Sequence, residues 1–227
     1  MMRKMLHYKL QFLNALRKMG FSIPFTLFFA FAGCSIVDPA PTTTSPELDV
    51  RNYYLQLTSS NVEYNYAVTS TVPIYYPASG SLAMDMHGLA DTVNSMPVYS
   101  CLWTYQNFGT PTLWYYGLTD KQAINFGVES WPGNYADSWV DLQSPLQDSA
   151  SWTFTSHNEP ITATVVKYGA SAQVNGKTYS DVVMVQYAGT KGTTGTGWFA
   201  RGTGIIYSNI VRDSEMVENQ LQSVIQK

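Results

Sequence analysis

Hydrophobic and polar residues alternate with a period of two along most of the chain after residue 50. In the run 62–69 the larger apolar side chains share one face: Val62, Tyr64, Tyr66 and Val68. Successive side chains of a β-strand point to opposite sides, so this period is typical of a strand with one buried face. The runs 82–87 and 99–105 repeat the pattern, and we expect all three to form half-buried strands.

The later part of the chain continues in the same way. Strands are predicted over residues 113–118, 123–128, 152–155, 161–168, 182–187, 198–201 and 204–211. Turn signals at spacings of roughly 8 to 12 residues are typical of an all-β sandwich, barrel or curved sheet. The tail after Asp213 fits a helical stripe as well as an alternating one, and we favour a closing strand.

Glycine and asparagine mark the sharpest turns of the predicted sheet. Asn175 and Gly176 stand between two alternating runs, and both tolerate the positive φ that a type I′ hairpin turn needs. The segment 189–197, GTKGTTGTG, is predicted to be a mobile loop. Gly202 and Gly204 interrupt a strand-like run, where glycine indicates a bulge or a sharp bend.

The first 49 residues follow a different pattern. Five basic residues and no acidic residue precede a short apolar run, 21–32, which suits a signal peptide better than a membrane span. The segment 31–34, FAGC, resembles the lipobox of bacterial lipoproteins, in which the cysteine is lipidated. This resemblance implies a signal peptide over residues 1–33, a lipidated Cys34 with a Pro/Thr-rich flexible tether over 34–49, and a single domain over 50–227. The alternatives are an unmodified cysteine in an ordinary secretory signal and an amphipathic N-terminal anchor.

The net charge of the predicted mature chain limits the classes of partner that it can bind. Removing residues 1–33 takes away five of the 13 basic residues and none of the 16 acidic residues, which leaves a net charge of −8. Nucleic acid is therefore not an expected partner, because binding it requires clustered Lys and Arg. The expected membrane contact is the lipid on Cys34. Ser35 is not the aspartate that retains enterobacterial lipoproteins at the inner membrane, so we expect a cell-envelope protein on the outer membrane, facing the periplasm.

Three segments in the second half of the chain carry a resemblance to a known group. PLQDSASWTF from Pro145, VNGKTYSDVVMVQY from Val174 and GWFARGTGIIYSNI from Gly197 resemble a pattern of uncharacterised lipoproteins of Bacteroidetes. Their fold is similar to the curved antiparallel half-barrel of periplasmic lipoprotein carriers. The resemblance covers roughly residues 145–211. It implies an all-β domain built as a curved antiparallel sheet, a half-barrel or an open barrel.

The sequence contains no recognisable catalytic or metal-binding set. Asp85, His87 and Asp91 form the only His–carboxylate cluster, and two neighbours on one strand supply only part of a metal site. A Gly-x-Ser-x-Gly elbow, a His-Glu-x-x-His motif and a Cys–His pairing are all missing. No catalytic residue, metal or cofactor is therefore predicted, although a hydrolase with an unrecognised site stays open as an alternative.

Aromatic residues are the remaining candidates for binding. Possible ligand-binding residues are Trp103, Trp114, Tyr116, Trp131 and Trp139, and the competing explanation is core packing. One apolar face of a curved sheet cannot stay in water, and the concave side is predicted to carry Tyr64, Tyr66, Met84, Met86 and Trp103. We therefore favour a non-catalytic binding or assembly module for an apolar ligand or an envelope protein. Carbohydrate capture at the surface is the alternative.

Overall fold

A single twelve-stranded antiparallel sheet makes up most of the residues that the computed structural model describes, which are 49–72, 77–106, 109–127 and 138–227. A short 3-10 helix, η1 (Val50–Tyr53), precedes the strands. The strands are β1 (Val62–Ser70), β2 (Ser79–Val93), β3 (Met96–Tyr105), β4 (Thr112–Leu118), β5 (Gln122–Gly127), β6 (Trp139–Gln143), β7 (Ser151–Ser156), β8 (Glu159–Val174), β9 (Lys177–Gly189), β10 (Thr194–Ala200), β11 (Gly204–Arg212) and β12 (Glu215–Gln226). The predicted all-β fold class and the closing C-terminal strand are confirmed.

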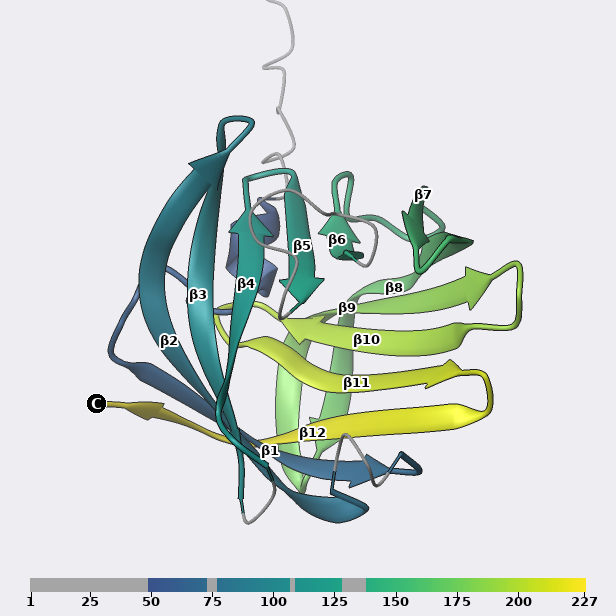
Figure 1. Ribbon diagram of the computed structural model, residues 1–227. Helices are drawn as coiled ribbons and strands as arrows, with labels where there is room; N and C mark the ends of the chain where they lie inside the picture. Colours follow the sequence, from purple (N-terminus) through teal and green to yellow (C-terminus); the bar gives the residue numbers. More distant parts are fainter. Residues whose placement is uncertain (1–48, 73–76, 107–108, 128–137) are drawn as a thin grey trace, which may run out of the picture. The chain divides into compact units, whose positions relative to one another are not determined.

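The strand order shows how the sheet curls. The order is β6-β5-β4-β3-β2-β1-β12-β11-β10-β9-β8-β7, so the first and last strands pair in the middle and the two edge strands are consecutive in the sequence. Only seven residues, 144–150, join β6 to β7, and such a segment spans at most about 25 Å. The two edges must therefore lie near each other, and the sheet bends into the nearly closed wall of Figure 1.

Contacts between the two edge strands confirm this bend. The indole N–H of Trp152 on β7 donates to the carbonyl oxygen of Val140 on β6, at 3.4 Å. Leu142 near the end of β6 and Leu146 in the connection between β6 and β7 are both fully buried. The prediction of a curved sheet or open barrel is confirmed, and the closure is further advanced than a half-barrel requires.

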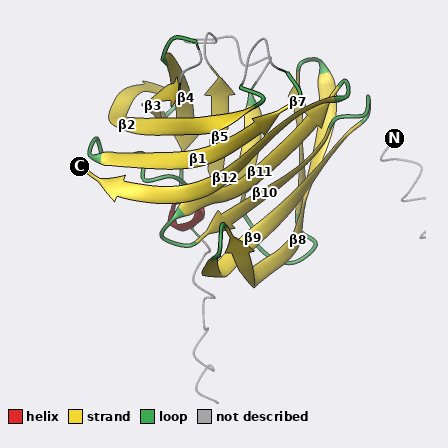
Figure 2. Cartoon of the chain, turned by 90° about the horizontal axis from the view of Figure 1, so that it is seen from below, coloured by secondary structure: helices red, strands yellow, loops and turns green. Residues whose placement is uncertain are grey.

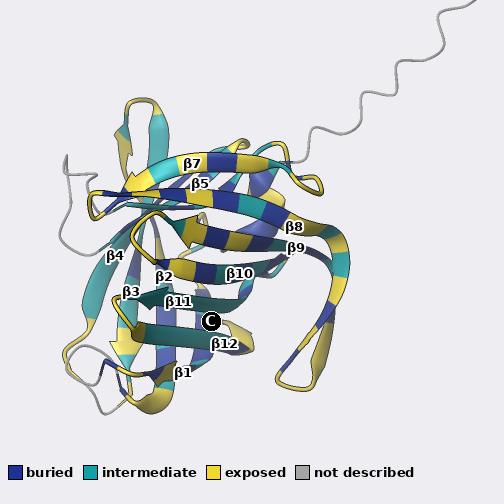
Figure 3. Cartoon of the chain, turned by 90° about the vertical axis from the view of Figure 1, so that its right-hand side faces the viewer, coloured by how far each residue is buried: buried dark blue, intermediate teal, exposed yellow. Residues whose placement is uncertain are grey.

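Buried and more exposed residues alternate along the strands, as the period of two in the sequence predicts. On β1 the residues Val62, Tyr64, Tyr66 and Val68 are all at most 1% exposed. Met84 and Met86 on β2 are buried in the same way, and the same alternation marks β8 and β9 in Figure 3. The buried faces of β1 and β2 thus point to the interior of the curved sheet.

Residues 50–57 cover the inner face at one end of the sheet. The backbone N–H of Val50 donates to Asp120 in the β4–β5 turn, and Gly202 in the β10–β11 turn donates to Asn52. Five side chains of this segment are at most 2% exposed: Val50, Tyr53, Tyr54, Leu55 and Leu57. We call this segment the floor, and it contains η1, drawn in red in Figure 2.

A glycine allows the floor to approach the sheet closely. Gly204 has φ +101°, and a Cβ built on it would lie 3.0 Å from the backbone nitrogen of Leu55. Such a Cβ would displace the floor backbone. The predicted bend at Gly202 and Gly204 is therefore real, and it forms the β10–β11 turn and the start of β11.

The predicted turn at Asn175 and Gly176 is confirmed. Val174 on β8 pairs with Lys177 on β9, and the two residues between them have φ values of 48° and 75°. Positive φ at both central residues is the requirement of a type I′ turn.

Two sequence expectations were wrong. The mobile loop expected over 189–197 is reduced to a short turn, because β10 begins at Thr194. Gly195 and Gly197 lie in that strand since neighbouring side chains fill the space of a Cβ, which would lie 2.6 Å from Ile210 and 2.8 Å from Phe199. The sequence reading also missed β6, whose five residues contain only a short alternation.

Candidate functional site: an aromatic cavity with a buried carboxyl group

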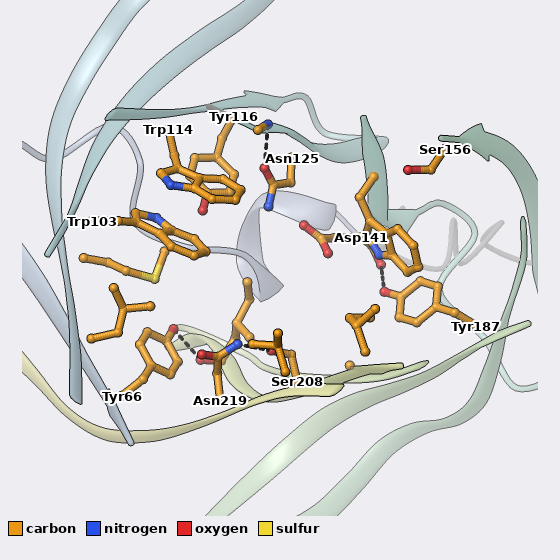
Figure 4. Close-up of a pocket in the computed structure, with 18 of the residues that line it drawn as sticks. Tyr66, Trp103, Trp114, Tyr116, Asn125, Asp141, Ser156, Tyr187, Ser208 and Asn219 are labelled. Carbon is orange, nitrogen blue, oxygen red and sulfur yellow. Dashed lines mark hydrogen bonds between the residues drawn. The ribbon is translucent and has the colours of Figure 1, made fainter. Parts of the chain in front are cut away.

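The interior of the sheet holds a cavity of about 860 Å³ that is open to solvent. The odd-numbered strands end, and the even-numbered strands begin, at the end of the sheet opposite the floor. Residues beside these strand ends line the cavity, among them Val72, Thr112, Gly127, His157 and Arg212. The cavity therefore occupies the end of the interior that the floor leaves unfilled, and Figure 4 shows part of its lining.

Two stacked tryptophans form one wall of the cavity. The rings of Trp103 on β3 and Trp114 on β4 lie 4.0 Å apart, with 13° between their planes. Trp103 pairs with Thr112 and Trp114 with Cys101, so the two tryptophans are diagonal neighbours on one face of the strand pair. Diagonal neighbours are within reach of each other when the side chains are aromatic. The stack is therefore a direct product of the strand register.

The opposite wall contains a second aromatic group. The Trp139 ring on β6 packs edge to face against Tyr187 at 5.0 Å and against Phe154 at 5.2 Å. The Arg212 guanidinium lies 6.0 Å from the Trp139 ring centre. Trp139 therefore contacts two aromatic rings and lies within reach of a charged residue of the lining.

The structure brings together most of the aromatic residues selected from the sequence. Trp103, Trp114, Tyr116 and Trp139 all line the cavity, and Trp131 lies outside the described residues. Surface carbohydrate capture was expected to need exposed, coplanar tryptophans, and of the candidates that the structure describes, Trp103 and Trp114 stack on each other. Tyr66, Met84 and Trp103, which were predicted on the concave side, also line the cavity, whereas Tyr64 and Met86 are fully buried.

Asp141 is the residue that sequence reasoning missed. It lies two residues after Trp139 on β6, and both side chains line the cavity. Its carboxylate accepts a hydrogen bond from the Tyr54 hydroxyl of the floor, and its backbone carbonyl accepts one from the Tyr187 hydroxyl at 2.7 Å. Burial raises the pKa of Asp141 to about 7, and the hydrogen bond from Tyr54 partly opposes this rise. The alternation Trp139-Val140-Asp141 puts Asp141 on the same side of the strand as Trp139, and this pattern could have identified Asp141 from the sequence.

The side-chain carbonyl oxygen of Asn219 in the lining has no hydrogen-bond partner within the described residues. The indole N–H of Trp103 and the hydroxyl of Tyr116 make no hydrogen bond of good geometry with the described part of the chain, but Trp103 is close enough to oppose the rise in the pKa of Tyr116 that burial causes. Tyr116 is only 1% exposed, and in Figure 4 its hydroxyl points toward the cavity. Buried polar groups in proteins are nearly always satisfied, if not by protein then by water or a ligand. The lining is therefore complementary to an occupant that carries polar groups as well as apolar surface.

Near the opening, a buried carboxylate fixes one turn of the sheet. Glu159 accepts hydrogen bonds from the backbone N–H of Lys191 at 2.5 Å and from the hydroxyl of Thr193. These bonds, led by the one from Thr193, lower the pKa of Glu159, and the charge of Arg212 adds to the effect. Glu159 thus holds the β9–β10 turn and the Arg212 charge in place beside the cavity.

The candidate metal ligands do not converge. Asp85 accepts a hydrogen bond from the Lys227 ammonium at 2.8 Å, while His87 and Asp91 are exposed. Within the described ranges no three His, Cys, Asp or Glu side chains form a group that could hold a metal ion. Cys101 is free and fully buried on β3.

One histidine reaches a hydroxyl group at the cavity. The His157 Nδ1 and the Ser156 Oγ lie 3.1 Å apart at the β7–β8 turn, and both residues line the opening. A nucleophile needs a base that is itself oriented by a third group. The nearby Glu159 engages Lys191 and Thr193.

The predicted signal peptide, Cys34 and the tether lie outside the described residues. In the part of the chain that is described, no helix is both long and apolar enough to span a membrane.

Comparison of the sequence with protein-family models and with curated proteins gave no match. Among solved structures the chain is similar to a protein from Parabacteroides distasonis ATCC 8503 that is provisionally described as a lipoprotein. The TM-score is 0.43 at 10% sequence identity, over 77% of this chain and 99% of that chain. At this TM-score the likeness carries no argument about function.

Proposed function

We propose that this protein is a lipid-anchored lipoprotein of the cell envelope that binds an amphiphilic small molecule without catalysing a reaction. The observation that carries the proposal is the open cavity of about 860 Å³, lined by the aromatic residues around Trp103 and Trp139. Ligand sites for small molecules are typically 300–1,000 Å³, mostly apolar, with a few placed polar groups. The volume, the stacked tryptophans and the carboxyl group of Asp141 all match that description.

A cavity-filling substitution tests the binding role. Ser208 on β11 lines the cavity, and its hydroxyl accepts a hydrogen bond from Asn219 at 3.2 Å. Ser208→Phe places a ring in the hollow and should weaken binding of the neutral fluorescent probe N-phenylnaphthylamine by about tenfold or more. Asn209→Phe is the matched control, because Asn209 is the next residue on the strand and does not line the cavity.

The outcomes of this experiment are distinct. The wild-type protein and Asn209→Phe should bind the probe alike, and circular dichroism should show that both variants fold. Equal probe binding by Ser208→Phe and the wild type would place the probe outside the cavity and overturn the proposed function. Absence of probe binding by the wild type would overturn it as well.

The anchoring part of the proposal rests on the sequence around Cys34. At about 0.8 kcal/mol per buried CH₂, several acyl chains would hold the protein on its membrane almost permanently. Cys34→Ala should abolish labelling by radioactive palmitate and move the protein to the soluble fraction, with Cys101→Ala as the matched control. Continued labelling of Cys34→Ala would remove the basis of the localisation.

A further inference from the structure

Asp141 has no opposite charge beside it among the described residues. The described lining contains two carboxylates, Asp141 and Glu215, one guanidinium, Arg212, and one imidazole, His157. Asp141 takes part in no ion pair within the described residues, and its hydrogen-bond partners are neutral tyrosine hydroxyls. An enclosed ionised carboxylate is costly unless a cation or several hydrogen bonds compensate it.

The two basic residues of the described lining, Arg212 and His157, both contact groups other than Asp141, and the His157 Nδ1 lies 3.1 Å from the Ser156 Oγ. The Arg212 Nε donates to the hydroxyl of Thr193 at 3.3 Å, and the guanidinium lies over the ring of Trp139. Its charge acts on Glu159, whose pKa it helps to lower. Arg212 is therefore held at the opening by groups other than Asp141.

The internal segments outside the described residues bring no further basic residue. Their sequences are PIYY at 73–76, NF at 107–108 and VESWPGNYAD at 128–137, and they contain neither lysine, arginine nor histidine. The compensating cation for Asp141 is thus not supplied by these segments.

The surroundings of Asp141 suit a cation. The aromatic rings of Trp103, Trp114 and Trp139 line the same cavity, and aromatic faces attract ammonium groups. The side-chain oxygen of Asn219, which lacks a partner within the described residues, can accept a hydrogen bond from an ammonium group, which has three donors. A ligand with an apolar body can lie against the tryptophan stack at the same time.

We propose that the ligand is an amphiphilic primary amine, whose ammonium group pairs with the Asp141 carboxylate and whose apolar body packs against Trp103 and Trp114. This inference rests on the proposed binding function and names the chemical class of its ligand. Asp141 is the specificity residue, because it alone distinguishes an ammonium head group from a hydroxyl or a carboxylate on the same chain.

A chain-matched competition experiment tests the inference. Decylammonium, decanol and decanoate are each titrated, below the concentration at which they form micelles, against protein loaded with N-phenylnaphthylamine. At about pH 8 the Asp141 carboxyl is mostly ionised and the amine is still protonated. Decylammonium should displace the probe at about tenfold lower concentration than decanol, and decanoate should be the weakest.

Two variants test whether the Asp141 carboxylate causes the preference for decylammonium over decanol. In Asp141→Asn the preference for decylammonium over decanol should vanish while the probe still binds. Glu215→Gln removes the same charge from the opening of the cavity, and it should keep the preference. A preference that survives in Asp141→Asn, or that is lost in Glu215→Gln alone, overturns the inference.

The competition also separates this inference from the proposed function. If the probe binds in the cavity but decylammonium and decanol displace it equally, the amine specificity is wrong and the binding function stands. If neither the probe nor any of the three compounds binds, by fluorescence or by isothermal titration calorimetry, both proposals fail.

Discussion

Replacing Asp141 by Asn should change the stability of the protein in a pH-dependent way. Burial raises the pKa of Asp141 from 3.8 to about 7 in the folded protein. The folded state therefore holds a proton that the unfolded state has already released between these two pH values. Stability must fall as the pH rises through this window, because the unfolded state binds fewer protons. Asp141→Asn removes the ionisable group, so the variant should not lose stability as the pH rises through this window.

The size of the effect follows from the same shift. A difference of roughly 3 pKa units corresponds to roughly 4 kcal/mol, at about 1.4 kcal/mol per unit. Solvent in the open cavity screens part of this, so we expect Asp141→Asn to be more stable than the wild type by about 1 to 3 kcal/mol above pH 8. At about pH 4 the two proteins should differ little, because the wild-type carboxyl is then protonated in the folded state.

Three buried tyrosines around Asp141 do not titrate in this window. Burial raises the pKa of Tyr54, Tyr116 and Tyr187 well above 10. The difference between the wild type and Asp141→Asn therefore isolates one carboxyl group.

Urea denaturation at about pH 4.5 and pH 8.5 measures the effect, with the slope of the transition as a check on two-state behaviour. The free energy of unfolding of the variant minus that of the wild type should grow with pH. A difference that is independent of pH, or that shrinks as the pH rises, would show that Asp141 is not enclosed as described.

Three glycine substitutions probe the scaffold of the cavity. Gly204→Ala should destabilise the protein by about 2 kcal/mol or more in urea denaturation, since φ is +101° and the new Cβ would lie 3.0 Å from the floor backbone. Gly202→Ala is the control, because its φ is +69° and open space surrounds its Cβ. An equal loss of stability in both variants would mean that the contact with the floor backbone does not cause the effect of Gly204→Ala. Gly176→Val should cost about 1 kcal/mol or more at φ +75° by thermal melting, and an unchanged melting curve would exclude a type I′ turn.

The sequence predicted the sheet better than the cavity. Strands such as β1 and β2 were predictable because one buried face leaves a strict alternation, as in Tyr64 and Tyr66. The hairpin at Asn175 was predictable because positive φ has a residue signature. The aromatic residues could be selected as candidates, yet their meeting in one cavity depends on the register of β3 with β4 and on the closeness of β6 to β7.

Other features have no local signal. The glycines at 195 and 197 were interpreted as flexible, but they are strand residues whose Cβ positions are occupied by Ile210 and Phe199. The floor lacks a strand period, because its burial comes from contacts with turns far along the chain, such as the one at Asp120. Asp141 was missed because an acidic residue between apolar neighbours is usually on the solvent face, and here that face borders an internal cavity.

The floor explains why the interior is divided rather than hollow throughout. The apolar face of a curved sheet must be covered, and residues 50–57 cover one end with side chains that are almost completely buried. The other end is lined by large rings that carry polar atoms, such as Tyr116 and Trp103, and by the side-chain oxygen of Asn219, which has no partner within the described residues. Tyr54 belongs to the floor and donates its hydroxyl hydrogen to Asp141, so the packed end also fixes the carboxyl group that faces the open end. The same segment thus stabilises the fold and orients the group that we assign to ligand recognition.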